Sequence, residues 1–166
     1  MVYADPVSRA NNLHAGAHHE GPVDPDACGL ARAADLIGDR WTMLILREAL
    51  FGVTRFDAIQ NDIGCPRTIL SGRLKRLVES GVLTRRAYKE PGQRTRYQYV
   101  LTRKGVDLAL PMIALMQWGE KHCLDGAPGA EIVERATGAP ARVSLVNRDG
   151  APISAGETTL RKTSAF

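Results

Sequence analysis

One segment indicates the fold of this chain more clearly than any other: RTILSGRLKRLVESG, residues 67–81. Three leucines recur in it at helical spacing and predict one buried stripe: Leu70, Leu74 and Leu77. We therefore expect an amphipathic helix over residues 66–80, with Pro66 at its first position and Gly81 just past its end. The opposite face is small, polar and basic. That chemistry suits a DNA recognition helix, but also an ordinary surface helix whose basic face is solvated.

The sequence before this segment predicts a second, shorter helix. It starts at Thr54, which together with Asp57 resembles a capping box, and it runs to about Asn61. Residues 62–65 then form a tight turn. Two short helices joined by a glycine-containing turn, the second of them basic, indicate a helix-turn-helix.

The sequence after the segment predicts a β-hairpin. Residues 82–88 and 95–101 read as strands, and Pro91-Gly92 supplies the turn between them. A hairpin directly after a recognition helix is the wing of a winged helix, here residues 82–101. We therefore predict a mainly α fold with a small β-hairpin wing (α+β), a winged helix-turn-helix.

The remaining elements complete the predicted domain, residues 25–124. Helices are expected over residues 27–38 and 41–50, the latter central to the core because it is apolar nearly all round. A helix capped by Thr102 should run to about Leu124 with apolar side chains on two sides. Such a helix suggests a partner helix, and the economical partner is a second copy of the chain. Packing on the first helix of its own chain is the alternative.

Two segments lie outside this domain. Residues 1–24 have no periodicity and are expected to form a flexible arm. Residues 125–166 read as a linker and a small β-rich extension, with a strand over 142–146, a turn ending in Asp149-Gly150 and a return strand. A third strand is expected over 157–162.

The charge of the chain is unevenly distributed. Residues 66–104 hold eleven basic and two acidic residues, a net charge of +9, whereas the whole chain carries only +4. Segregation of this kind indicates a polyanionic partner, such as double-stranded DNA.

Several other classes of protein are disfavoured. The sequence has no apolar run long enough for a membrane span, no signal-peptide pattern and only three cysteines, so we expect a cytoplasmic protein with reduced thiols. We find no phosphate-binding loop, no metal-ligand spacing that forms a set and no paired carboxylates. We therefore expect no enzyme activity, no cofactor and no metal.

Several of these segments also resemble a known family, the HxlR-type transcriptional regulators, a branch of the MarR-like winged helix-turn-helix proteins. The resemblance runs from about Cys28 to His122 and rests on IGDRWT at residues 37–42, LSGRLKRL at 70–77 and YVLTRKG at 99–105. It implies a homodimer held by the first and last helices of the domain and bound to a palindromic operator. Gly72 departs from the pattern, since many members have a polar or acidic residue there, and so does Gly29, where proline is usual.

We assign expected DNA contacts residue by residue. Major-groove contacts are expected from the recognition helix, with the first as a candidate guanine reader: Arg67, Thr68, Ser71 and Lys75. Phosphate contacts are expected from four further residues: Arg76, Arg85, Arg86 and Lys89. The wing should add Arg94 and Arg96, with Arg94 at a tip that could enter a minor groove.

The signal that such a regulator would sense stays open. Some HxlR-type regulators sense oxidants through a cysteine at the position of Cys28, and a thiol at a helix N-terminus is activated by the helix dipole. Asp24 and Asp26 oppose that effect, and a small buried residue near the dimer interface is the alternative for Cys28. A small-molecule effector would bind between the DNA-binding region and the dimerisation helices. A winged helix used only for protein–protein contact is the competing function.

Overall fold

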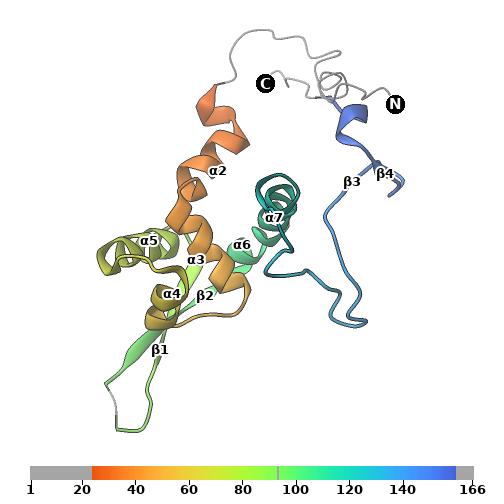
Figure 1. Cartoon of the computed structure of the whole chain (residues 1–166). Helices are drawn as coiled ribbons and strands as arrows, with labels where there is room; N and C mark the ends of the chain where they lie inside the picture. Colours follow the sequence, from red (N-terminus) through yellow and green to blue (C-terminus); the bar gives the residue numbers. More distant parts are fainter. Residues whose placement is uncertain (1–23, 93, 160–166) are drawn as a thin grey trace. The chain divides into compact units, whose positions relative to one another are not determined.

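The computed structural model describes residues 24–92 and 94–159 (Figure 1). Most of the expected flexible arm therefore lies outside the described residues. The chain divides into two compact units, one of residues 33–141 and one of residues 1–32 with 142–166. Within the described ranges, no helix is both long and apolar enough to cross a membrane.

From residue 25 to residue 124 the chain is helical with one β-hairpin, as predicted. The element order is α2 (Gly29–Ile37), α3 (Arg40–Leu50), α4 (Phe56–Ile63), α5 (Arg67–Glu79), β1 (Leu83–Tyr88), β2 (Arg96–Leu101), α6 (Arg103–Val106) and α7 (Ala109–Cys123). A short 3-10 helix, Pro25–Ala27, precedes α2. β1 and β2 pair antiparallel from Leu83 opposite Leu101 to Tyr88 opposite Arg96.

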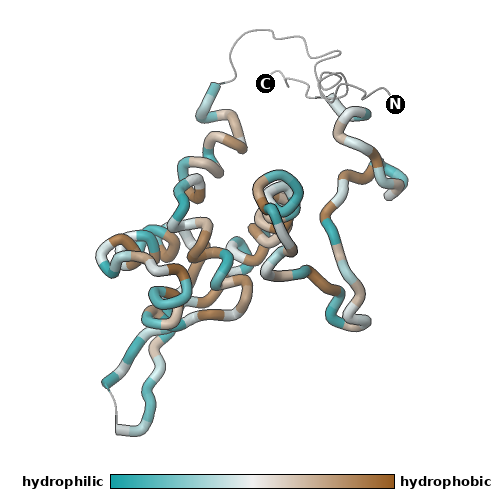
Figure 2. The backbone as a smooth tube through the Cα atoms, viewed as in Figure 1, coloured by the Kyte–Doolittle hydropathy of each residue, from teal (hydrophilic) through white to brown (hydrophobic). Residues whose placement is uncertain are grey.

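The core lies where α3, α4 and α5 meet. α3 contributes Ile45 and Leu46, both without solvent exposure, and α4 contributes Ile59. α5 contributes the three predicted leucines, which are buried as expected: Leu70, Leu74 and Leu77. Figure 2 shows brown, hydrophobic segments within α3, α4 and α5, whereas the wing loop is mainly hydrophilic. The recognition helix is thus fixed by its apolar face and leaves its polar face free.

Glycine and proline set the ends of the two helices of the motif. Gly64 ends α4 with a φ of 64°, and Gly81 follows α5 with a φ of 73°, both left-handed conformations that favour glycine. Pro66 is the residue just before α5 rather than its first residue. The predicted position of Gly81 is therefore confirmed, and that of Pro66 is off by one.

The predicted capping box at Thr54 is wrong. α4 begins at Phe56 and has no side-chain cap, while the Thr54 hydroxyl lies 3.3 Å from Gln98 Oε1. The Thr54 carbonyl accepts a hydrogen bond of 2.8 Å from the Tyr99 amide, and Arg55 forms a β-bridge with Gln98. Pairing with the wing therefore holds this segment extended and takes Thr54 away from the helix end.

The predicted single helix from Thr102 to Leu124 is divided in two. Thr102 does cap the start, because its hydroxyl accepts the Gly105 amide hydrogen bond at 3.2 Å. The helix then ends at Val106 and restarts at Ala109. Pro111 explains the break: it lacks an amide hydrogen, and inside a helix its ring would clash with the carbonyl of Asp107. In the first turn of α7 neither problem arises.

The C-terminal extension contains the predicted hairpin. β3 (Leu145–Val146) pairs antiparallel with β4 (Pro152–Ile153). The predicted third strand is wrong at its start, because Ala155–Glu157 is a 3-10 helix capped by Ser154, and residues 160–162 lie outside the described part. Glu157 accepts hydrogen bonds from the Ser154 amide and hydroxyl, which favours a turn over an extended strand.

Candidate nucleic-acid interface

The polar face of α5 is open to solvent. Thr68, Ser71 and Lys75 are exposed, and they lie opposite the buried leucines. Lys75 Nζ lies 3.7 Å from Glu79 Oε1, one turn further along the helix. These three side chains are available to a groove of DNA, and their contact with base edges stays a prediction.

Arg67, at the start of the same helix, is contacted by three side chains of α4, one of them Gln60, whose Oε1 accepts a hydrogen bond of 3.5 Å from Arg67 Nη1. Its Nη1 lies 3.4 Å from Asp57 Oδ1, and its guanidinium stacks 4.7 Å above the ring of Phe56. The Arg67 side chain is nevertheless 71% exposed. It is therefore oriented by the protein while its outer donors face solvent.

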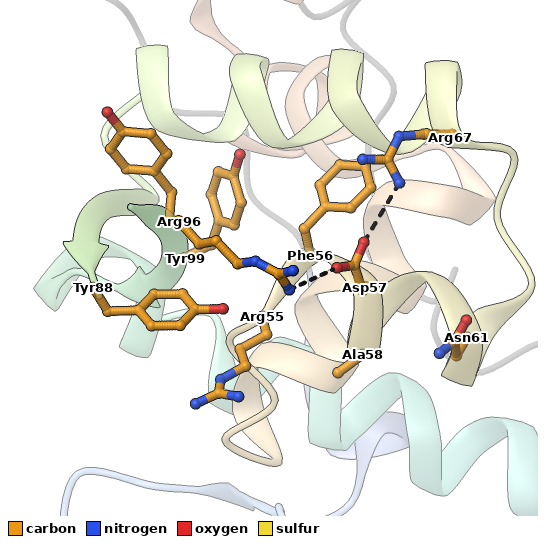
Figure 3. A pocket seen from close by; sticks show the side chains of 10 residues that line it. Arg55, Phe56, Asp57, Ala58, Asn61, Arg67, Tyr88, Arg96 and Tyr99 are labelled. Atoms are coloured by element: carbon orange, nitrogen blue, oxygen red, sulfur yellow. Dashed lines mark hydrogen bonds and ion pairs between the residues drawn. The ribbon is translucent and has the colours of Figure 1, made fainter. Parts of the chain in front are cut away.

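Asp57 also reaches the wing. Its Oδ2 lies 3.6 Å from Arg96 Nη1, so one carboxylate joins the recognition helix to β2 (Figure 3). Around it lies a pocket of about 630 Å³ with three arginines and four aromatic rings in its lining. The lining residues are Arg55, Phe56, Asp57, Ala58, Asn61, Arg67, Tyr88, Arg96, Tyr97 and Tyr99. Our reading of the sequence missed the roles of Asp57 and Arg55 here, because no local pattern shows that α4 and the wing meet.

Arg55 reinforces the same junction. Its Nη2 lies 2.9 Å from Glu90 Oε1, and its guanidinium stacks 4.8 Å above the Tyr88 ring. The loop end of the wing, at Tyr88 and Glu90, is thus attached to the segment before α4 by an ion pair and a stacking contact, and Gln98 of β2 adds the β-bridge with Arg55. These contacts fix the direction of the wing relative to the recognition helix.

The other predicted wing residues differ in their surroundings. All four are exposed, and Arg85 also stacks on the Tyr97 ring at 3.7 Å: Arg85, Arg86, Lys89 and Arg94. Arg85 and Arg86 are consecutive in β1, so their side chains point to opposite faces of the hairpin. The two expected phosphate contacts therefore lie on different faces of the wing.

Two arginines of α5 contact other parts of the same chain instead of solvent alone. Arg76 donates a hydrogen bond to the backbone carbonyl of Asp35 at the end of α2, although its side chain was expected to contact phosphate. Arg73 Nε lies 3.0 Å from Asp39 Oδ1 and ties α5 to the start of α3. The spacing of Asp39 and Thr42 is a sequence signal for an N-cap of α3, but no local pattern indicates the contact with Arg73.

Asp39 is the N-cap of α3, and its carboxylate accepts hydrogen bonds from Thr42 and Arg73. It accepts hydrogen bonds from the Thr42 amide (3.1 Å) and the Thr42 hydroxyl (2.5 Å). Partial burial acts to raise the pKa of this carboxyl, but the hydrogen bonds from Thr42 and the nearby Arg73 guanidinium together lower it below its usual value of 3.8.

This lowered pKa predicts an acid-dependent loss of stability. A group whose pKa is lower in the folded state stabilises the fold above its unfolded pKa, and that contribution is lost as the pH falls through the folded pKa. At pH 7 we expect Asp39→Asn to lower the free energy of unfolding by up to about 1 kcal/mol, because the ion pair is partly exposed. Below pH 3.8 the difference between wild type and variant should shrink toward zero.

Urea denaturation across a pH series measures this difference. Asp62→Asn, an equal change of charge at an exposed position of α4, is the control and should not show the same pH-dependent gap. A gap between wild type and Asp39→Asn that stayed constant down to pH 2 would contradict the assignment to this carboxyl.

The three cysteines have different environments. Cys28 is half-buried and lies directly before α2, and its carbonyl accepts the Arg32 amide hydrogen bond of the first helical turn. Cys65 is 2% exposed, and burial raises the pKa of its thiol, which disfavours the reactive thiolate despite its place beside α5. Cys123 is exposed at the end of α7. Within the described ranges, no group of three or more His, Cys, Asp or Glu is placed to hold a metal.

The chain belongs to the HxlR-like helix-turn-helix family, which matches residues 36–126. This match confirms the family suggested by the sequence and covers the motif, the wing and α7. An uncharacterised HTH-type transcriptional regulator of Mycobacterium tuberculosis (strain H37Rv) is 46% identical over 93 residues, 56% of this chain. The match spans only 58% of that relative's length.

Solved structures agree with the fold. The crystal structure of PA1607, a candidate transcription factor, has a TM-score of 0.71 and 35% identity, and covers 89% of this chain and 99% of its own. That coverage exceeds the family match, so part of the C-terminal extension has a counterpart there. The reduced form of the transcriptional regulator YodB from Bacillus subtilis has a TM-score of 0.50 and 28% identity over 60% of this chain and 98% of its own. These relatives are named as regulators rather than enzymes, in line with our expectation.

Proposed function

We propose that this protein is a sequence-specific, double-stranded-DNA-binding transcriptional regulator that acts as a homodimer on a palindromic operator. One observation carries the proposal: in a member of the HxlR-like family, α5 is anchored by three buried leucines and presents a free polar and basic face beside a basic wing. This is the arrangement by which a helix enters a major groove while a hairpin follows the backbone. Such a role would place the protein with the genome, in the cytoplasm.

The expected DNA contacts fall into two groups, those of the recognition helix and those of the wing. The face of α5 that carries Thr68, Ser71 and Lys75, with Arg67 at its start, would read base edges. Lys89 and Arg86 would bind phosphates, and Arg94 would reach the minor groove from the wing loop. Arg76 is the least suited of the candidates for phosphate contact, because its guanidinium already has a partner on α2.

A second copy of the chain is the proposed partner of α7. That helix has no buried residue, and four large apolar side chains of α6 and α7 are at least 47% exposed: Val106, Leu110, Leu115 and Trp118. Leu30 on α2 is 80% exposed. Apolar surface of this extent favours burial in a dimer, and a two-fold dimer matches two half-sites of DNA.

The proposal is tested by selecting bound duplexes from a random DNA pool, footprinting the enriched duplex and measuring the mass of the complex. We expect an inverted repeat with half-sites centred about 10 base pairs, or a multiple of that, apart, bound by two chains. A pool without enrichment, or one chain on a single half-site, would contradict specific binding by a homodimer. A winged helix that serves protein–protein contact is the alternative, and it predicts no enrichment.

Oxidation of Cys28 is a candidate signal. The likeness to YodB, solved in a reduced form, supports it, as does the position of Cys28 at the start of α2. With diamide we expect at least a tenfold loss of affinity for the selected duplex in the wild type and none in Cys28→Ser, measured by fluorescence anisotropy. Equal responses of the two proteins would remove Cys28 from the proposal.

A small-molecule effector is the other candidate signal. An open pocket of about 550 Å³ lies between α3 and α7, and residues 128–130 also line it. Its size suits a small ligand, and its walls include Phe51, Met116 and Leu124. The pocket adjoins the proposed dimerisation helix, as we expected for an effector, but its other walls come from α3 and residues 128–130 and not from α4, α5 or the wing.

A further inference from the structure

Asp57 lies at the centre of the pocket between α4, α5 and the wing. Each of its two carboxylate oxygens forms an ion pair with a different arginine. Oδ1 lies 3.4 Å from Arg67 Nη1, and Oδ2 lies 3.6 Å from Arg96 Nη1. Figure 3 shows the two guanidinium groups approaching different oxygens of the carboxylate. Among the residues that line this pocket, Asp57 is the only acidic one.

These ion pairs are weak ones. Each arginine uses one nitrogen, at a distance longer than that of a good charge-assisted hydrogen bond, and no bidentate contact forms. All three side chains are more than half exposed: 71% for Arg67, 56% for Arg96 and 61% for Asp57. Exposed pairs of this kind are held loosely, so either arginine can exchange the carboxylate for another acceptor.

DNA offers both arginines better acceptors. Phosphate oxygens and the guanine edge accept bidentate hydrogen bonds from arginine, and both are expected within reach of the recognition helix and the wing. When the arginines turn to DNA, the Asp57 carboxylate is left without its partners beside a polyanion. Its charge then opposes binding instead of neutralising the two cations.

We propose that Asp57 is an internal competitor of DNA: its carboxylate occupies Arg67 and Arg96 in the free protein and thereby lowers the affinity for every duplex. The inference rests on the proposed function and adds a residue that sets its strength. A carboxylate at this place would limit non-specific retention on the genome, since non-specific binding depends on freely available cations.

The test uses the full chain with Asp57→Asn, titrated with the selected duplex and with a random duplex of equal length. We expect the variant to bind both about 2- to 10-fold more tightly, the range that two exposed ion pairs represent. Asp62→Asn, also in α4 and exposed, changes the net charge equally and should alter the affinity less than about twofold, because the ion pairs of Arg67 and Arg96 are with Asp57 and not with Asp62, and an exposed charge is screened by salt.

A second pair of variants tests whether Asp57 acts through the two arginines. In an Arg67→Ala, Arg96→Ala background, at a salt concentration low enough for binding, adding Asp57→Asn should raise the affinity no more than Asp62→Asn does, less than about twofold, because only the repulsion between the carboxylate and DNA remains. A gain in that background as large as in the otherwise wild-type chain, an equal gain in Asp62→Asn, or weaker binding by Asp57→Asn would each overturn the inference while the wild type still binds DNA. Absence of any wild-type binding at low salt would instead overturn the proposed function, and this inference with it.

Discussion

Replacing Leu74 with alanine is expected to lower the free energy of unfolding by about 2–5 kcal/mol. Leu74 has no solvent exposure and lies midway along α5, between Leu70 and Leu77. Its loss removes apolar contacts and leaves a cavity beneath the recognition helix. Urea denaturation at one fixed protein concentration measures the effect, because a dimer would make stability depend on concentration.

Ile69 provides the matched control on the same helix. Its side chain is 38% exposed, so Ile69→Ala removes less buried surface and replaces a β-branched residue by a better helix former. We expect a change of less than about 1 kcal/mol. Equal losses for Leu74→Ala and Ile69→Ala would contradict the packing of α5 through its leucine face.

Replacing Arg67 with alanine is expected to lower the affinity for the selected duplex by about 1–3 kcal/mol, roughly 5- to 150-fold, and to relax the sequence preference. Arg67 begins the recognition helix, is oriented by the Phe56 ring and keeps most of its surface exposed. It is thus prepared to donate two hydrogen bonds to a guanine edge. Anisotropy titrations with the selected duplex and with single-base variants measure both effects.

Lys89→Ala is the control variant with which the Arg67→Ala titrations are compared. Lys89 is exposed in the wing and is expected to bind phosphate, so its loss should weaken all duplexes nearly equally and reduce the salt slope by about 1. If Arg67→Ala instead lost the same affinity on selected and random duplexes, Arg67 would be a phosphate contact and not a base reader.

Much of the fold could be predicted because its signals are local. The leucine spacing in α5, Gly81 after it and the Pro91-Gly92 turn each define an element within a few residues. The elements that we placed wrongly depend on neighbours. Thr54 leaves the helix end because the wing pairs with it, and the helix after Thr102 breaks because Pro111 acts on a carbonyl four residues earlier.

The candidate site also combines features with local signals and contacts that depend on distant residues. The charge and position of Arg67 and the wing arginines indicate a DNA contact, but the sequence does not indicate which side chains of the protein they contact. Asp57 is 10 residues from Arg67 and 39 from Arg96 in sequence, and only the packing of α4 against the wing brings the three together.

The packing around Gly105 also depends on a distant residue. A Cβ atom at this position would lie 2.3 Å from the Val82 carbonyl oxygen, and no local sequence signal indicates this close approach.

The most direct test of specific DNA binding is a salt series of the wild-type protein on the selected duplex and on a random duplex of equal length. We expect log Kd to rise steeply and linearly with log salt on both, with the selected duplex bound more tightly at every concentration. Equal affinity for the two duplexes, or no binding at low salt, would contradict a sequence-specific regulator. No binding would favour the alternative of a winged helix used for protein–protein contact.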